Sequence, residues 1–297
     1  MTGEKARNDL PLLLGLFAIN VFWGGSFIAN AIALESVGPI EIASLRFFIA
    51  APLLAIVTLL WKGPSIFRVE TKDLLTLVAM AITGVTLQYA IQVTAQSFTT
   101  AINASLLINT STFFILFLSA LFLAEKLTAS RVIGAFIGFG GVALLVSGGT
   151  LGFSLGQIGD LMIILCALLW AAYSILGKKI AGKYHPLTIL NWVFILGTIG
   201  LVPLYFLTPH ADPATIPLSA WGAILFLALL CSIVAYLIYN VALETMDASR
   251  VALFIYLVPL ATIVLAWLIL GERLNLASAF GGLLVLAGMW IAERKIS

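Results

Sequence analysis

Ten apolar runs, each about as long as a membrane-crossing helix, follow one another along the chain with only short connections between them. A helix that crosses a bilayer needs about 20 mostly apolar residues. The charged residues, 9% of the chain, lie mainly in the connections. The sequence therefore predicts an all-α integral membrane protein with ten transmembrane helices. We expect these helices at residues 11–34, 39–61, 74–96, 101–123, 131–148, 158–178, 187–207, 219–241, 250–270 and 276–292.

Composition removes several classes of function. A net charge of +2 leaves no basic surface for nucleic acid. There is no Gly-x4-Gly-Lys-Ser/Thr loop for ATP, and both histidines, His185 and His210, fall in loops. Cys166 and Cys231 lie inside apolar runs, where we expect buried free thiols. With no nucleophile–base pair and no set of metal ligands, we expect no enzyme, no metal and no cofactor.

One acidic–basic pair occurs twice, in LAEKL at Leu123–Leu127 and in LGERL at Leu270–Leu274, 147 residues later. Other rare residue types repeat with the same offset. Because Trp, Pro, Tyr and Glu are uncommon in so apolar a chain, their matches in one register indicate an internal repeat. The matched pairs are Trp23 and Trp170, Ile28 and Ile175, Pro39 and Pro186, Phe47 and Phe194, Tyr89 and Tyr236, Ala101 and Ala248, Glu125 and Glu272, Gly134 and Gly281, and Gly141 and Gly288.

The repeat divides the chain into two halves, residues 1–148 and 149–297, with five predicted spans each. Five is an odd number, so the second half must enter the membrane from the opposite side. The halves are therefore predicted to be inverted repeats around a central cavity, related by a pseudo-two-fold axis in the membrane plane. Since the first apolar run matches an internal one, we expect a structural helix there rather than a cleaved signal peptide.

The basic residues predict the orientation. With the N-terminus inside, all of the 15 lysines and arginines except Arg46 and Arg273 lie on the cytoplasmic side. Both termini are then cytoplasmic, and we expect a multi-pass protein of a bacterial inner (plasma) membrane. Glu125 and Glu272 follow the fourth span of each half on opposite faces. We interpret them as interfacial anchors, with Lys126 and Arg273 snorkelling; a gating role is the alternative.

The whole chain resembles one family. Its ten spans, its two five-span halves, LAEKL and LGERL before the last helix of each half, VFWGGSF in the first span and LRFFIAA in the second are similar to the drug/metabolite transporter superfamily, and more narrowly to the bacterial EamA-type exporters. The resemblance implies alternating-access export of small metabolites, often amino acids. Some members handle aromatic amino acids, and others move nucleotide sugars or sugar phosphates.

Polar and aromatic residues fall on one face of several spans. Polar side chains that face lipid are costly, so these should point inward. Gln88 and Gln92 share a face with Gln96, and residues at matching places in both halves are also polar or aromatic. The alternative is that they are helix–helix hydrogen bonds and interface aromatics. We predict a substrate cavity lined by Trp23, Ser26, Gln88, Tyr89, Gln92, Asn109, Trp170, Tyr173, Tyr236, Tyr239, Asn240 and Tyr256.

Arg46 is the only charge expected deep in a span. Two interpretations stay open. The guanidinium caps backbone carbonyls or pairs with Glu41, although a spacing of i, i+5 does not place the two squarely on one face. Alternatively, it attracts a substrate carboxylate near the outer mouth.

A neutral cavity with aromatic and amide groups suits a zwitterion, because an ammonium group is attracted to Trp and Tyr faces. We therefore expect export of neutral or zwitterionic metabolites, foremost amino acids, down a gradient or by exchange. Phosphorylated substrates would need fixed Lys or Arg. A multidrug exporter of the same superfamily is the main alternative; a membrane-embedded enzyme or a non-transporting scaffold is disfavoured.

Glycine and proline residues predict where the helices bend and where they pack closely. Gly24, Gly25 and Pro259 are candidate hinges, with static packing as the alternative. The small residues of the fifth and tenth helices, such as Gly134 and Gly138, allow close approach. We expect these two helices to pack on their own half or on another copy of the chain, which would give a homodimer through helices five and ten.

Overall fold

The computed structural model describes residues 3–99, 101–147, 158–270 and 276–293. Within these ranges only the backbone is described for residues 3–9, 102–103, 142, 145–147, 266–267, 269–270, 277–279 and 293. Glu272 and Arg273 of the second acidic–basic pair therefore lie outside the described residues.

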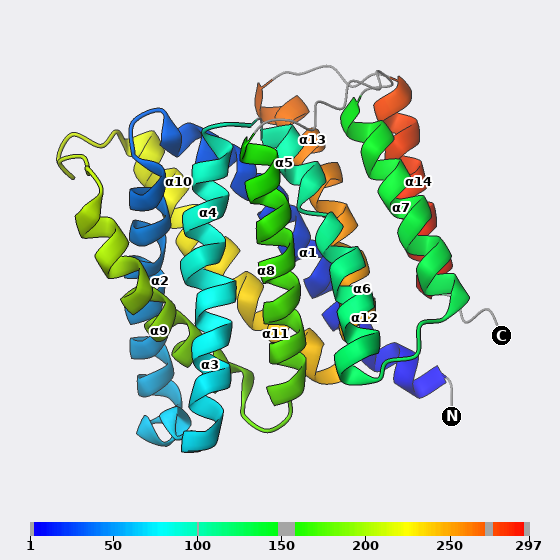
Figure 1. Ribbon diagram of the computed structural model, residues 1–297, viewed down its shortest axis with the longest axis horizontal. Coiled ribbons are helices and arrows are strands. Elements are labelled where there is room, and N and C mark those ends of the chain that lie inside the picture. Colours follow the sequence, from blue (N-terminus) through cyan, green and yellow to red (C-terminus); the bar gives the residue numbers. More distant parts are fainter. Residues whose placement is uncertain (1–2, 100, 148–157, 271–275, 294–297) are drawn as a thin grey trace.

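The described chain is helical throughout, with one isolated bridge between Ala181 and Tyr184. Figure 1 shows the helices running roughly alongside one another between two ends of the molecule. The first half holds α1 (Gly3–Leu34), α2 (Pro39–Lys62), η1 (Pro64–Phe67), η2 (Thr71–Asp73), α3 (Leu74–Ala81), η3 (Ile82–Thr86), α4 (Leu87–Gln96), α5 (Ala101–Leu107), α6 (Thr110–Leu123) and α7 (Ala129–Ser147). The second half holds α8 (Ile158–Ile180), α9 (Pro186–Leu207), α10 (Leu218–Ala228), η4 (Leu229–Val234), α11 (Ala235–Thr245), α12 (Ala248–Leu253), η5 (Phe254–Tyr256), α13 (Leu257–Leu270) and α14 (Leu276–Glu293).

The ends of the helices follow local sequence rules. Pro39 and Pro186 occupy the first position of α2 and α9, where a missing N–H costs nothing. The side chain of His185 caps α9 by accepting the Leu187 N–H at 3.1 Å. Gly63 ends α2 with a φ of 73°, a conformation that favours glycine.

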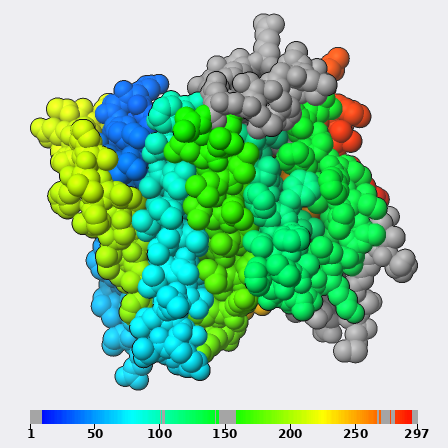
Figure 2. All heavy atoms as spheres, in the orientation of Figure 1, coloured from blue at the N-terminus to red at the C-terminus, as the bar shows by residue number. Residues whose placement is uncertain are grey.

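Among the described residues, eight helical segments are long and apolar enough to cross a membrane: 10–34, 39–62, 71–96, 104–123, 158–180, 186–207, 218–245 and 248–265. Large apolar side chains such as Leu75, Leu161 and Phe117 are more than half exposed on the outside. They come from α3, α8 and α6, which contribute to the face shown in Figure 2. An outer surface of this kind belongs in lipid, so the protein is a multi-pass membrane protein.

Two helices of each half are interrupted, at matching places. The π-helical turns η3 and η4 begin at Ile82 and Leu229, which are repeat mates. The break between α5 and α6 at residues 108–109 matches η5, which precedes Pro259. Proline has no N–H for the helix ladder and its ring clashes with the preceding turn, which accounts for the second break.

Three pairs of repeat mates touch one another in the middle of the bundle. Ring centroids lie 5.2 Å apart for Trp23 and Trp170 and 5.1 Å apart for Phe47 and Phe194. The hydroxyl oxygens of Tyr89 and Tyr236 lie 3.0 Å apart and are hydrogen-bonded to each other. In each of these pairs a residue of the first half contacts the residue 147 positions later in the second half.

The helices α7 and α14 form a pair beside the rest of the bundle (Figure 1). Their backbones approach closely through glycines: a Cβ on Gly134 would lie 2.5 Å from the Gly288 carbonyl oxygen, and one on Gly141 would lie 2.7 Å from the Val285 nitrogen. The close approach predicted for the fifth and tenth helices is present. However, it joins the last helices of the two halves to each other, rather than each to its own half.

Candidate functional site: a central cavity and the network below it

We call the end of the bundle where α1 begins the N-terminal face; it carries residues 63–70, 124–128 and 181–185. The opposite face carries residues 35–38, 97–99 and 208–217. Apart from Arg46, every lysine and arginine with a described side chain lies at the N-terminal face. The basic asymmetry expected from the sequence is therefore present among the described residues.

A partly enclosed cavity of about 50 Å³ lies in the bundle, towards the opposite face. That volume holds a few water molecules and is too small for a whole amino acid. Its wall is formed by Trp23, Ser26, Phe27, Gln88, Tyr89, Gln92, Ile108, Ser111, Trp170, Ile255 and Val258.

The wall draws on both halves at matching positions. Ile108 and Ile255 are repeat mates, as are Ser111 and Val258, and all four lie at or beside the two helix breaks. Interrupted helices of this kind supply binding sites in many transporters with repeated halves.

The cavity wall carries neutral polar groups, and two of their oxygen atoms have no hydrogen-bond partner. The Oε1 atom of Gln88 and the Oγ atom of Ser111 are buried without a hydrogen-bond partner. The Gln88 Nε2 atom donates to Gln92 Oε1 at 3.3 Å, and the Trp23 Nε1 atom donates to the Cys231 carbonyl at 3.1 Å. A buried polar atom without a partner costs free energy, and each of these two oxygens can accept a further hydrogen bond.

An aromatic layer separates the cavity from the N-terminal face. The rings of Trp170 and Tyr173 stack with their centroids 5.1 Å apart, and the ring centroid of Tyr236 lies 5.4 Å from that of Trp170. Deeper still, Tyr239 shares a hydrogen bond of 2.7 Å with Ser174, and the Asn240 amide donates to the Tyr173 hydroxyl at 2.7 Å. These side chains are buried and hydrogen-bonded, so the bundle is closed on this side of the cavity.

The two π-helical turns expose carbonyls to this centre. The Cys231 carbonyl in η4 accepts from Trp23 and from Arg46, and the Gly84 carbonyl in η3 accepts from the Tyr236 hydroxyl. Gly84 and Cys231 are repeat mates. A π-turn releases carbonyls from the regular helix ladder, and such turns are common at functional sites.

Arg46 lies directly behind the cavity wall and is 1% exposed. Its guanidinium carbon sits 4.0 Å from the centroid of the Tyr89 ring. The Nε atom donates to Ser232 Oγ at 2.5 Å, and Nη2 donates to the Cys231 carbonyl at 3.0 Å and to the Tyr89 hydroxyl at 3.2 Å. Arg46 therefore does cap a backbone carbonyl, whereas Glu41 does not pair with it: the Glu41 carboxylate accepts the Ala211 N–H.

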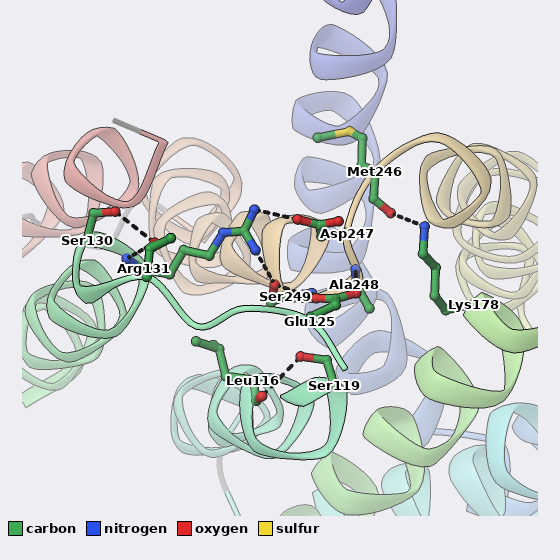
Figure 3. Close-up of polar contacts among 11 residues, drawn as sticks. Leu116, Ser119, Glu125, Ser130, Arg131, Lys178, Met246, Asp247, Ala248 and Ser249 are labelled. Carbon is green, nitrogen blue, oxygen red and sulfur yellow. Dashed lines mark hydrogen bonds and ion pairs between the residues drawn. The ribbon is translucent and has the colours of Figure 1, made fainter. Parts of the chain in front are cut away.

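Figure 3 shows a polar network at the N-terminal face that joins the two halves. The Glu125 carboxylate accepts the Ala248 N–H at 2.8 Å, the Ser249 N–H at 3.2 Å and the Ser249 hydroxyl at 2.6 Å. It thereby caps the start of α12, where Asp247 makes no cap of its own. Glu125 is set in place by Ala124, whose φ of 53° turns the chain at the end of α6.

Two cations complete this network (Figure 3). Arg131 forms an ion pair of 2.6 Å with Asp247 and also donates to Ser249 Oγ at 3.0 Å. Lys178 donates to the carbonyls of Leu243 and Met246 at 2.8 and 2.7 Å, at the end of α11. The connection between α11 and α12 is thus held by the connection that follows α6, by α7 and by α8.

A second polar cluster joins the halves on the same face. Lys183 pairs with Asp73 and, at 3.0 Å, with Glu70, and the Tyr184 hydroxyl donates to Asp73 at 2.6 Å. Hydrogen bonds from Lys72 and Lys183 lower the pKa of Glu70, and the hydrogen bond with Asp73 raises the pKa of Lys183. Both groups are therefore ionised at neutral pH.

The structure divides the predicted cavity residues into three groups. Trp23, Ser26, Gln88, Tyr89, Gln92 and Trp170 line the cavity. Tyr173, Tyr236, Tyr239 and Asn240 form the aromatic layer beneath it. Asn109 and Tyr256 lie elsewhere: Asn109 bonds to the Ser105 carbonyl at the helix break, and the Tyr256 hydroxyl donates to the Ala135 carbonyl of α7. Substrate binding stays a prediction for all of them.

The candidate hinges differ from one another. Pro259 follows a real interruption, η5. Gly24 and Gly25 lie within the unbroken helix α1, and a Cβ on Gly24 would be 2.7 Å from the Ala261 Cβ. Gly24 therefore allows α1 and α13 to pack closely, and of the three candidates only Pro259 lies beside an interruption of its helix.

The model of the EamA-like transporter family matches this chain twice, over residues 10–147 and 157–293. A protein from Archaeoglobus fulgidus named "Uncharacterized transporter" is 38% identical over 288 residues, which cover 96% of this chain and 97% of that protein. A solved crystal structure shares the fold with a TM-score of 0.79 at 19% identity, covering 95% of this chain and 96% of that one.

Two more distant relatives have names that mention a substrate. A "Probable terminal-alkyne amino-acid exporter" from Streptantibioticus cattleyicolor is 26% identical over 93% of this chain and 91% of its own length. A "Probable amino-acid metabolite efflux pump" from Escherichia coli is 26% identical over 96% of this chain and 95% of its own length.

Proposed function

Since the chain belongs to the EamA-like transporter family, we propose that it exports neutral or zwitterionic amino acids through the central cavity by alternating access. The observation that carries this proposal is the cavity itself. Its wall combines two indoles with the unpaired oxygens of Gln88 and Ser111 and contains no charged side chain. Such a wall can accept an ammonium group and pack against an apolar side chain.

Inverted repeats with five spans each, residues 1–148 and 149–297, are part of the proposal. Support comes from the two separate matches to the family model and from the paired helix breaks. In this arrangement α7 and α14 are the fifth and tenth spans. Their glycine faces are used by each other, so a homodimer through these helices would use their outer faces, where Phe136 and Trp290 are more than half exposed.

We further propose that the N-terminal face is cytoplasmic in a prokaryotic inner (plasma) membrane. The positive charges gathered there support this orientation, because cytoplasmic loops carry an excess of Lys and Arg. With the aromatic layer and both polar networks intact on that side, the described conformation is closed to the cytoplasm. Export then requires a second conformation in which the layer parts.

Exit from loaded liposomes tests the proposal. Liposomes with the purified chain are filled with labelled phenylalanine, threonine or methionine, and a second set is filled with a labelled aromatic organic cation. We expect amino-acid exit well above that of protein-free liposomes, and little exit of the cation. Exit of the cation alone would replace the amino-acid proposal with the multidrug alternative.

A further inference from the structure

Arg46 places a positive charge next to the cavity, and this charge bears on which substrates the cavity accepts. The inference deepens the proposed function and rests on it. Arg46 lies about 10 Å along α2 from its start at Pro39, given a helix rise of about 1.5 Å per residue. All three of its hydrogen-bond acceptors are neutral: a serine hydroxyl, a tyrosine hydroxyl and a backbone carbonyl. Among the residues with described side chains, no carboxylate lies within 4.0 Å of the guanidinium.

A buried guanidinium without a carboxylate is costly, and charged groups inside membrane proteins normally have an opposite partner. The two acids nearest to entering the bundle are engaged elsewhere. Glu41 binds the Ala211 N–H, and Asp160 accepts the Thr99 hydroxyl at 2.8 Å. Neither carboxylate lies within 4.0 Å of the guanidinium, so neither forms an ion pair with Arg46.

The charge lies close enough to the cavity to act on its contents. The guanidinium covers the Tyr89 ring, with 4.0 Å from its carbon to the ring centroid, and Tyr89 lines the cavity. An anionic group in van der Waals contact with the face of the Tyr89 ring away from Arg46 would be about 8 Å from the guanidinium, adding about 4 Å for that contact. At an effective dielectric constant of about 20, attraction over this distance is worth about 30-fold in affinity.

We propose that Arg46 makes the cavity selective for substrates with a carboxylate and excludes organic cations that lack one. It does so through Tyr89, as a specificity-determining residue rather than a direct ligand. The substrate carboxylate lies towards Tyr89. An ammonium group, where there is one, donates to the unpaired oxygens of Gln88 and Ser111. The substrate class is therefore amino acids and simple carboxylic acids.

Three compounds with one carbon skeleton test this proposal: phenylalanine, 3-phenylpropionate without the ammonium group, and phenethylamine without the carboxylate. Each competes against labelled phenylalanine for exchange into liposomes that contain the purified chain. We expect 3-phenylpropionate to inhibit at a concentration at least about 30-fold lower than phenethylamine does. Equal inhibition by the two compounds would overturn the proposal without any variant being made.

Variants then assign the selectivity to Arg46. Arg46→Gln should reduce the preference for 3-phenylpropionate by about 30-fold or more, whereas Arg46→Lys should keep it. Ser232→Ala removes a hydrogen bond to Arg46 but leaves its charge, so the preference should persist. If Arg46→Gln does not fold, the native chain and Arg46→Lys still test the proposal, because both should prefer 3-phenylpropionate to phenethylamine. An unchanged preference in folded Arg46→Gln would refute the role of Arg46.

The three compounds also separate this inference from the proposed function. If the chain exchanges amino acids and both analogues inhibit this exchange equally, the proposed function holds and the inference about Arg46 fails. Thermal stabilisation by each compound supplies the opposite case. A chain that exchanges no amino acid but is stabilised by 3-phenylpropionate over phenethylamine loses the function and keeps the selectivity.

Discussion

Replacing Glu125 by glutamine should shift the bundle towards a form that is open at the N-terminal face. The carboxylate caps α12 with two backbone N–H groups and one hydroxyl at 2.6–3.2 Å, and it comes from the other half of the chain. A form open at this face must pull the two halves apart there. Glu125 is therefore expected to stabilise the closed form.

The size of the effect follows from these contacts. Hydrogen bonds to a charged acceptor contribute about 1.5–3 kcal/mol each when buried, and Glu125 is only half-buried. The amide keeps one acceptor oxygen and turns an NH2 group towards the helix N–H groups. We expect a loss of about 2 kcal/mol, which shifts the ratio of closed to open forms about 30-fold.

Distances between spin labels measure this shift. Ala129→Cys on α7 and Glu244→Cys on α11 place labels at exposed positions on either side of the network, while the native cysteines are buried. In the Glu125→Gln background a population with a longer separation should appear. Glu35→Gln, the same change at an exposed residue of the opposite face, is the matched control. A distribution unchanged from the parent would mean that Glu125 anchors the chain without holding this face closed.

Other substitutions test separate parts of the structure. Gly138→Ala should destabilise the chain by about 1–3 kcal/mol in thermal unfolding, because its Cβ would lie 2.7 Å from a tyrosine ring of η5. Gly140→Ala, with nothing within 4 Å, should not destabilise it, and equal losses would contradict the packing of α7. Pro259→Ala should slow exchange about tenfold at unchanged affinity, because an interior proline costs a helix about 3 kcal/mol and its removal would let the helix continue unbroken. The control Pro203→Ala, in α9, should not slow exchange. Equal exchange rates in the two variants would argue against a hinge at Pro259. Tyr236→Phe removes a hydroxyl that donates to the Gly84 carbonyl and is also hydrogen-bonded to the Tyr89 hydroxyl. It should lower stability by about 1–2 kcal/mol in denaturant titration, and no loss would argue against these bonds.

The positions of the helices follow from the sequence almost residue by residue, because the apolar runs are long and the connections carry the turn residues. Pro39 and Pro186 sit where the helices begin, as their missing N–H groups require. The π-turns at Ile82 and Leu229 could not be predicted in this way. They depend on side chains from other helices, such as Tyr236 and Arg46, that bind the released carbonyls.

The cavity was predictable only in part. Gln88 and Gln92 were found because amides on one helical face are costly in lipid. Ile108, Ile255 and Val258 carry no polar signal, and they reach the cavity through helix breaks that periodicity does not show. Ser111 is polar, but two residues after Asn109 it lies on another side of a regular helix. It reaches the cavity beside the break at 108–109.

The neighbours of Tyr256 could not be predicted for a similar reason. Regular helical geometry places it like its repeat mate Asn109, but it ends the 3-10 turn η5 and packs against Gly138 of α7. The pairing of α7 with α14 was also out of reach, because glycines at suitable spacing reveal a close-packing face without naming the helix that covers it.

Blocking the cavity tests most directly whether substrate crosses the membrane there. Ser111 is fully buried and its Oγ atom is unpaired in the cavity wall. Ser111→Trp would fill a space of about 50 Å³. Phe117→Trp adds the same side chain to the same helix at a position that is 65% exposed, and it serves as the control.

The measurement is accumulation of trace labelled phenylalanine by liposomes that contain the purified chain and are loaded with unlabelled phenylalanine, without an ion gradient. Accumulation should occur with the native chain and with Phe117→Trp, and it should be lost with Ser111→Trp. Thermal unfolding of both variants at the same temperature as the native chain shows that they are folded. Full accumulation with folded Ser111→Trp would contradict the central claim, because the substrate would then cross by another route.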